Sequence, residues 1–148
     1  KEEIKKKLEK KCNEIRKEVD EGKKELAELP ILLTEISDKL FYQCVKLKKV
    51  IIPPTVEKIG KDAFKECVNL EQVDIPSSVK VISDGAFSGC KLLQNVAIPP
   101  SVWSIGSNAF RKSESFTSIE IRSLNSIHEY TKQTKHIKST ARFSLLRA

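Results

Sequence analysis

The sequence lacks several features that would place it in common protein classes. It contains no methionine, one tryptophan, two histidines and no apolar run of the roughly 18 residues that a membrane-spanning helix requires. It begins KEEIKKKLEKK, which has no apolar core of the kind found in a secretory signal. Because the chain starts at Lys1 and not at Met, we expect it to be processed or excerpted. The absent signal therefore says little about the native location.

Motifs for catalysis and for cofactor binding are also missing. The chain contains no phosphate-binding glycine loop, no GxSxG nucleophile elbow and no HExxH zinc motif. No CxxC spacing suggests zinc. His128 and His136 have no nucleophile or ligand set around them, and we expect Asp62 and Asp84 to face solvent in turns. The sequence therefore predicts a protein that is not an enzyme and that uses no cofactor or metal.

The net charge of +7 is concentrated in the last part of the chain. Residues 1–28 hold 10 basic and 9 acidic side chains, and residues 29–121 hold 11 and 10. Residues 122–148 hold 6 basic side chains against Glu129 alone. The basic balance is therefore a property of this C-terminal segment and not of the rest of the protein.

The most informative feature of the sequence is a repeat of 23 residues. The segment 51–73, IIPPTVEKIGKDAFKECVNLEQV, returns at 74–96 and 97–119 and, in a more divergent form, at 28–50. Eight positions in each repeat are apolar, and Ser113 alone breaks this pattern. In the second repeat these positions are Ile52, Val56, Ile59, Ala63, Phe64, Cys67, Leu70 and Val73. A fixed period in this range is typical of stacked repeat architectures.

Stacking follows from the small size of each repeat. One 23-residue coil buries too few side chains to offset the entropy of ordering it, so neighbouring coils must share their apolar faces. Leu70, Val73 and Ile75 have the LxxLxL spacing of a short strand, which Pro76 ends. We expect a second inward-pointing segment at Ile82 and a helical turn at each Ala-Phe pair. The phenylalanines should form one interior column, made of Phe41, Phe64, Phe87 and Phe110.

Three of the four cysteines also follow the repeat. Cys44, Cys67 and Cys90 are each one period apart, and Cys12 lies upstream. Because they occupy the same slot in consecutive coils, we expect buried free thiols that pack as small hydrophobic groups. Reduced thiols weakly favour an intracellular setting.

Residues 1–28 are predicted to form an amphipathic helix, which Pro30 stops. Its apolar residues recur every three or four positions: Ile4, Leu8, Cys12, Ile15, Val19 and Leu26. The helix either caps the open end of the stacked coils or forms a short coiled coil through which the chain self-associates. We favour the cap, because terminal repeats need one and because Gly22 occupies a core slot of the heptad.

Residues 122–148 lose the 23-residue period. We interpret them as a degenerate closing coil followed by a polar basic tail. The tail has an apolar group, Phe143, Leu145 and Leu146, that could fold back onto the last strand and cover its open edge.

The repeat pattern IPxSVxxIGxxAFxxCxxLxxV resembles that of the BspA-like leucine-rich-repeat proteins, also called the Treponema pallidum type. The resemblance covers residues 29–121, which we divide into four 23-residue repeats. The predicted fold class is a repeat solenoid, a β-rich leucine-rich-repeat right-handed coil with an N-terminal helical cap. The resemblance implies protein binding or adhesion at microbial surfaces without catalysis. The first repeat departs from the pattern at Ile31, Leu32 and Leu40, which we relate to end-capping.

The predicted binding surface consists of strand residues that point away from the core. These are Lys49, Ile51, Gln72, Asp74, Asn95, Ala97, Ser118 and Glu120. These residues have no common chemical character, which fits either a contact surface adapted to one partner or neutral sequence drift on a solvated face. Four strands about 4.8 Å apart span less than about 20 Å, which falls short of the roughly 800 Å² per partner of a standard interface. Binding is then weak, or the ends contribute, or the chain is part of a longer array.

Trp103 is a further candidate contact residue. Its slot holds Thr34, Glu57 and Lys80 in the other repeats, so the slot is expected to face water. The indole either anchors a protein contact or is covered by the C-terminal tail or by another copy of the chain. We favour the second alternative.

The sequence favours a non-enzymatic protein-interaction or adhesion module whose protein partner it does not identify. The alternative is a basic-tailed adaptor that binds nucleic acid or an anionic surface, with the repeats as scaffold. The cations concerned are Arg122, Lys132, Lys135, Lys138, Arg142 and Arg147. Against it, the tail offers few aromatic rings for base stacking, namely Tyr130 and Phe143. The resemblance implies a cell-surface location, whereas the free cysteines and the absent signal fit a cytoplasmic one.

Overall fold

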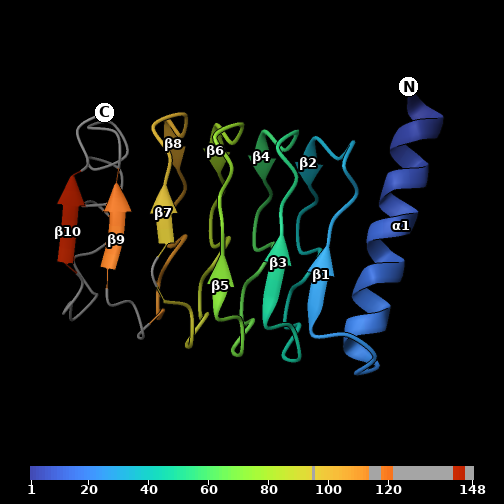
Figure 1. Cartoon of the computed structure of the whole chain (residues 1–148), viewed down its shortest axis with the longest axis horizontal. Helices are drawn as coiled ribbons and strands as arrows, with labels where there is room; N and C mark the ends of the chain where they lie inside the picture. Colours follow the sequence, from blue (N-terminus) through green and yellow to red (C-terminus); the bar gives the residue numbers. More distant parts are fainter. Residues whose placement is uncertain (95, 114–117, 122–141, 146–148) are drawn as a thin grey trace.

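The described residues form a row of flat coils stacked side by side, with one helix covering the N-terminal end (Figure 1). This computed structural model describes residues 1–94, 96–113, 118–121 and 142–145, the last two ranges as backbone only. The elements are α1 (Glu2–Asp20), β1 (Leu26–Glu28), β2 (Glu35–Ile36), β3 (Lys49–Ile51), β4 (Lys58–Ile59), β5 (Gln72–Val73), β6 (Val81–Ile82), β7 (Val96–Ile98), β8 (Ser104–Ile105), β9 (Ser118–Ile121) and β10 (Arg142–Leu145). Each coil contributes one strand to each of two sides.

All the strand pairs in the described ranges are parallel. On one side, which we call the main sheet, β1, β3 and β5 are paired, and β7, β9 and β10 continue the row (Figure 1). On the other side, β2, β4, β6 and β8 form the second sheet. The register places Val50 beside Val73 and Ile59 beside Ile82, one repeat apart in each case. Equivalent side chains therefore lie directly over one another along the stack.

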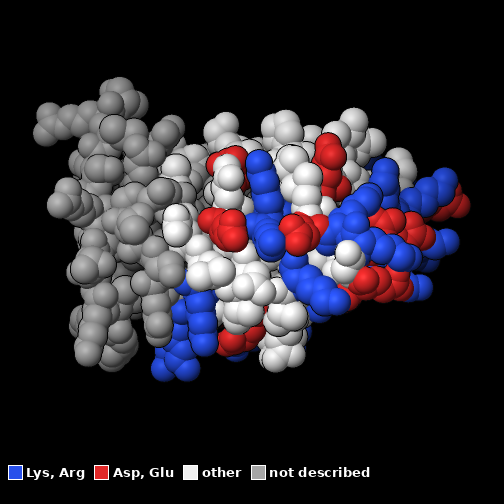
Figure 2. All heavy atoms as spheres, turned by 60° about the horizontal axis from the view of Figure 1, so that its bottom comes forward, with Lys and Arg blue, Asp and Glu red and all other residues white. Residues whose placement is uncertain are grey.

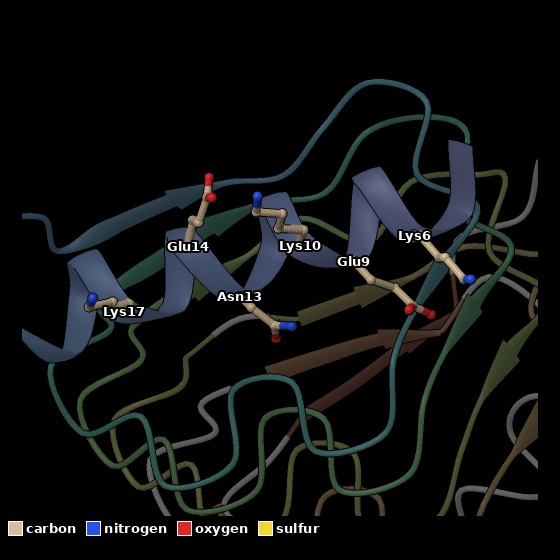
Figure 3. Close-up of a pocket in the computed structure, with 6 residues that line it drawn as sticks. All are labelled: Lys6, Glu9, Lys10, Asn13, Glu14 and Lys17. Carbon is tan, nitrogen blue, oxygen red and sulfur yellow. The ribbon is translucent and has the colours of Figure 1, made fainter. Parts of the chain in front are cut away.

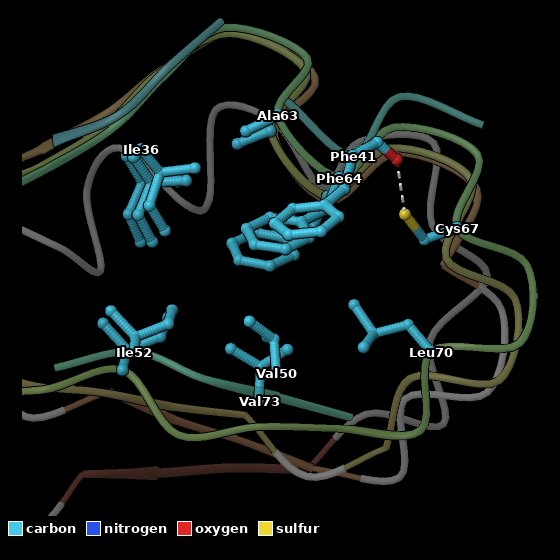
Figure 4. Close-up of a cluster of buried hydrophobic side chains, with 14 of the residues drawn as sticks. Ile36, Phe41, Val50, Ile52, Ala63, Phe64, Cys67, Leu70 and Val73 are labelled. Atoms are coloured by element: carbon cyan, nitrogen blue, oxygen red, sulfur yellow. Dashed lines mark hydrogen bonds between the residues drawn. The ribbon is translucent and has the colours of Figure 1, made fainter. Parts of the chain in front are cut away.

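The core lies between the two sheets and consists of columns of identical or similar side chains (Figure 4). Phe41, Phe64, Phe87 and Phe110 stack with ring centroids 5.4, 5.1 and 5.4 Å apart and interplanar angles of 9°, 2° and 6°. The predicted interior column is therefore confirmed. Every one of the eight repeat positions that the structure describes, Ser113 included, is buried.

The Ala-Phe segments are turns and not the helical turns that the sequence suggested. Residues 61–66 form a run of turns in which Asp62 and Glu66 have φ angles of 54° and 61°. A left-handed residue at each end prevents the segment from continuing as a helix. The Phe64 N–H instead donates to the Ala86 carbonyl of the next coil at 2.8 Å. The segment therefore adds a backbone ladder beneath the phenylalanine column.

The cysteine slot forms a column of hydrogen-bond donors. The Cys67 thiol donates to the Phe41 carbonyl at 3.0 Å and the Cys90 thiol to the Phe64 carbonyl at 3.1 Å. Ser113 occupies the same slot in the fourth repeat, and its hydroxyl donates to the Phe87 carbonyl at 2.9 Å. Serine is therefore compatible with this slot because it is small and supplies the same donor. All four cysteines are buried and free, which confirms the prediction for Cys44, Cys67 and Cys90 and adds Cys12.

The helix ends at Asp20 and not at residue 28, which corrects the predicted boundary. Gly22 has φ 75°, and its N–H donates to the Val19 carbonyl, while the Lys23 N–H donates to that of Glu18. These two bonds and the left-handed glycine make a Schellman motif, which terminates a helix. Leu26 consequently belongs to β1, beside Lys49 of β3, and not to the apolar face of the helix.

The helix caps the first coil by supplying the groups that a preceding coil would supply. In the turns around the Ala-Phe pairs, backbone N–H groups donate to carbonyls of the next coil, as Phe41 does to Ala63. The Leu40 and Tyr42 carbonyls occupy equivalent positions in the first coil, and the Arg16 guanidinium donates to them at 3.0 and 2.6 Å. Asp20 accepts the Cys44 thiol at 3.4 Å. Cys12 and Val19 are buried against the coil, with Leu8 and Ile15 packed beside them.

The C-terminal strand extends the main sheet beyond the fourth repeat. β10 pairs in parallel with β9, with Phe143 beside Ile119 and Leu145 beside Ile121. This pairing confirms that the apolar segment covers the edge of the preceding strand. Leu146 lies outside the described residues, as do residues 122–141, where the closing coil and most of the basic tail were predicted.

Candidate functional site

The outward face of the main sheet brings together several of the predicted binding residues. Lys49 of β3 and Gln72 of β5 are in register, and both are exposed. Ile51 is 41% exposed, Asp74 is exposed, and Ala97 is half-buried. Ser118 and Glu120 lie in β9, with Glu120 beside Ala97. Asn95 lies outside the described residues.

Two further residues of this face were missed by the sequence reasoning. Leu26 pairs with Lys49 and Glu28 pairs with Ile51 across β1 and β3. Leu26 is 39% exposed and Glu28 is exposed. They were missed because the helix was predicted to continue to residue 28. The signal that could have found them was the period itself, since Leu26 precedes Lys49 by one repeat.

The electrostatics of the main sheet face are mixed. The Gln72 amide donates to the Asp74 carboxylate at 3.5 Å, and the Lys48 and Glu25 side chains at the edge of the face form an ion pair at 3.1 Å. Figure 2 shows cationic and anionic side chains intermingled, most densely over the N-terminal end. Exposed pairs of this kind contribute little stability. They display both signs of charge on the surface of this face.

Trp103 lies on the second sheet and is not part of the main sheet face. It directly precedes β8, and its backbone N–H donates to the Lys80 carbonyl at 3.0 Å. The side chain is 62% exposed. In the same row, the Lys80 ammonium lies 3.3 Å from the Glu57 carboxylate. The slot therefore faces solvent, as its polar equivalents indicated, and more than half of the indole surface is uncovered.

The outer face of α1 has a shallow hollow that does not form a ligand site. Its side chains fan outward and alternate in charge (Figure 3). They are Lys6, Glu9, Lys10, Asn13, Glu14 and Lys17. All of them come from one side of a single helix, so nothing encloses a ligand there. The face is a solvated surface, and it lacks the apolar stripe that a coiled coil would need. From Leu8 to Val19, the apolar stripe of α1 is instead packed against the first coil.

The buried thiols are unsuited to nucleophilic chemistry. Burial raises the pKa of Cys44 to about 12, and the hydrogen bond from its thiol to Asp20 adds to this. Burial likewise raises the pKa of Cys90 to about 12 and raises the pKa values of Cys67 and Cys12. Thiolates are the reactive form of cysteine, so these groups stay protonated and inert. Among the described residues, no cluster of three His, Cys, Asp or Glu side chains could hold a metal ion. His128 and His136 lie outside them.

The raised thiol pKa values predict a loss of stability in alkali. As pH rises above about 9, the unfolded chain releases thiol protons that the folded chain retains, so the free energy of unfolding falls by up to about 1.4 kcal/mol per thiol per pH unit. We expect the triple variant C44S/C67S/C90S, which keeps a donor in each slot, to lose less stability. Urea unfolding of both proteins at pH values between about 8 and 10.5 measures the difference. Equal slopes would contradict this prediction.

Stacked coils with LxxLxL strands in parallel register define a leucine-rich-repeat protein. The chain belongs to the BspA type: the family model described as "BspA type Leucine rich repeat region (6 copies)" matches residues 23–141. The match includes most of the segment for which a closing coil and tail were predicted. No curated protein matches the sequence. Among the described residues, no helix is long and apolar enough to cross a bilayer.

Several solved structures of leucine-rich-repeat proteins are similar to this chain. One from Bacteroides ovatus has a TM-score of 0.70 and 27% identity, covering 83% of this chain and 30% of that one. The T. pallidum protein TpLRR has a TM-score of 0.54 and 30% identity, covering 67% of this chain and 59% of that one. One from Bacteroides capillosus has a TM-score of 0.61 and 27% identity, covering 67% and 78%. The chain therefore spans 30% of the length of the Bacteroides ovatus protein and 59% of the length of TpLRR.

Proposed function

We propose that this chain is a non-enzymatic protein-interaction module that binds its partner with the outward face of the main sheet. One observation supports this proposal above the others. Along the register, inward positions keep the same side chains, as Val50 and Val73 do, whereas outward neighbours such as Lys49 and Gln72 differ. A scaffold of constant core and variable face suits recognition of other proteins, and the family as a whole consists of such scaffolds.

The chemistry of the face indicates the kind of partner that fits it. Ile51 presents an exposed apolar side chain, with Lys49 two residues before it on β3. Glu28 pairs with Ile51 from β1, and Asp74 directly follows β5, the strand on the other side. A complementary partner presents an apolar group flanked by cations. The described strands number six on this side, from β1 to β10, and at about 4.8 Å each they span about 24 Å. The face is therefore wider than the span of less than about 20 Å that we expected from four strands.

The proposal has two further parts: Trp103 as an additional contact residue, and adhesion as the role that the binding serves. Since the indole lies on the second sheet, a partner that also contacts it must reach around the coil. Adhesion at a microbial surface rests on the likeness to the BspA type. A basic-tailed adaptor is the competing function, and of its six cations only Arg142 lies in the described residues, where it starts β10 beside Ser118.

Two charge exchanges on opposite sheets test the proposal. The double variant K49E/D74K inverts the main sheet face, and E57K/K80E inverts an ion pair on the second sheet, both without changing net charge. The probe is a random peptide library displayed on phage and selected on the immobilised wild-type chain. We expect the selected peptides to bind E57K/K80E as they bind the wild type, and to bind K49E/D74K at least about tenfold more weakly.

The same selection separates the competing assignments. Peptides that bind both double variants equally well would contradict the main sheet face as the site. A third variant, K132E/K135E/K138E, covers the alternative. Loss of binding to this variant alone, with steep salt dependence, would assign function to the basic segment.

A further inference from the structure

A second surface lies at the N-terminal end, away from the outward face of the main sheet. A hollow of about 720 Å³ opens between the first half of α1 and residues 32–38 of the first coil. Among the apolar side chains that line it, Leu8 is half-buried, whereas Ile4 and Leu32 are 57% and 63% exposed. Ile31, adjacent to Leu32, is 78% exposed. Apolar side chains thus gather at one end of an otherwise charge-rich helix.

Leu32 is out of place by comparison with its equivalents in the other coils. Those positions hold Thr55, Ser78 and Ser101, whose hydroxyls donate to Leu33, Val56 and Val79 carbonyls of the preceding coil at 2.6, 2.6 and 2.7 Å. The first coil has no preceding coil to receive such a bond, so a hydroxyl is not needed there. A leucine that stays 63% exposed gains the fold little, however. An exposed apolar group next to a hollow is typical of an interaction site.

The two walls of the hollow carry opposite charges. On the α1 wall are Lys1 and Lys5, followed by Glu9 toward the helix centre, and on the coil wall are Glu35 and Asp38. Lys1 and Lys5 have no ion-pair partner among the described residues. In the part of the chain that the structure describes, Glu35 forms an ion pair with the exposed Lys58 alone, 3.7 Å away. The two lysines of the α1 wall are therefore available to form ion pairs with an acidic surface of another molecule.

We infer that the hollow is the contact surface for a second copy of this chain, in a two-fold symmetric dimer. A two-fold interface requires a patch that complements itself. Here the rotation sets the Lys5 wall of each copy against the Glu35 wall of the other, while Ile4 and Leu32 meet at the centre. The hollow is lined by twelve residues, fewer than the roughly 20–30 a side of a standard interface, so the dimer is weak and dissociates at micromolar concentration.

Analytical ultracentrifugation of the full chain from about 5 to about 500 µM tests the dimer. We expect reversible dimerisation that weakens in high salt, and that L32T, which installs the residue type of the other coils, weakens at least about tenfold. The control I51T removes an exposed apolar side chain from the main sheet and leaves the association unchanged. Circular dichroism confirms that both variants keep their fold.

A charge exchange across the interface makes the test specific. K5E and E35K are each expected to weaken association, and K5E/E35K together to restore it, because each copy again presents opposite walls. A chain that is monomeric at all these concentrations overturns the inference, as does a dimer that L32T or the single charge variants leave unchanged. Binding of the apolar dye ANS at this hollow by a strictly monomeric chain, abolished in L32T, assigns it to a different apolar partner and also overturns it.

Discussion

Replacing Phe87 with alanine is expected to lower the free energy of unfolding by about 3–5 kcal/mol. The ring is fully buried and stacks on Phe64 at 5.1 Å and on Phe110 at 5.4 Å. The truncation therefore removes a large apolar side chain, leaves a cavity between coils and breaks two aromatic contacts. Since small domains are stable by only about 5–15 kcal/mol, much of the total would be lost. Urea unfolding followed by circular dichroism measures the change.

Coupling between coils gives this variant a second expected effect. Each coil is stabilised by its neighbours, so a gap in the column separates the N-terminal coils from the C-terminal ones. We expect a broader unfolding transition with a smaller dependence on urea. The matched control is V45A, which truncates a side chain that is 47% exposed and should change stability by less than about 0.5 kcal/mol. If F87A cost no more than V45A, the phenylalanine column would not be a principal source of stability.

The interior of the solenoid could be predicted from the sequence because one geometric rule governs it. A side chain that returns every 23 residues must return to the same place in a stack. Phe41 and Phe110 could therefore be assigned to one column from their spacing alone. The same rule extended upstream would have found Ala27 beside Val50, where the structure places it. The helical spacing from Val19 to Leu26 concealed this, since it continues smoothly across Gly22.

What could not be predicted depends on contacts that leave no periodic signal. Arg16 is one of ten basic residues in the first 28, and nothing in its spacing distinguishes it from Lys17 on the solvated side. The left-handed turns at Asp62 and Glu66 are occupied by residues other than glycine, which do not indicate the conformation, whereas Gly85 and Gly89 mark the same positions one repeat later. For the candidate site, outward strand positions followed from the period. The position of Trp103 could not be predicted in the same way, because the sequence did not show that its slot flanks the strands of the second sheet.

The two proposed surfaces lie on different parts of the molecule. The main sheet face runs along the stack, whereas the hollow lies at the end that α1 covers (Figure 1). Lys49 and Asp74 do not line the hollow, and Leu32 is not in the main sheet. Self-association through the hollow therefore leaves the main sheet face of each copy free, and a dimer presents two such faces. Such a pair gains avidity for a repetitive target.

Arg16→Ala is expected to destabilise the protein by about 2–4 kcal/mol, through the end cap and not through the core. The Arg16 side chain is 25% exposed, and its guanidinium donates to the Leu40 and Tyr42 carbonyls and pairs with Asp20 at 3.0 Å. Its loss leaves two partly buried acceptors without the donors that a preceding coil would provide. Arg16→Lys should be intermediate, because an ammonium lacks the planar fork that reaches both carbonyls.

Hydrogen exchange locates the effect of this variant, which urea unfolding alone does not. In R16A we expect faster exchange of amides in the first coil, around Leu40 to Leu47, and near-normal protection around Phe87, because repeat arrays unfold from a weakened end. Lys17→Ala is the matched control, since the Lys17 side chain is 76% exposed on the outer side of the same helix. If R16A and K17A gave the same stability and the same exchange pattern, the guanidinium would not be the group that closes the array. Uniformly faster exchange in R16A would instead make α1 part of one cooperative unit with all the coils.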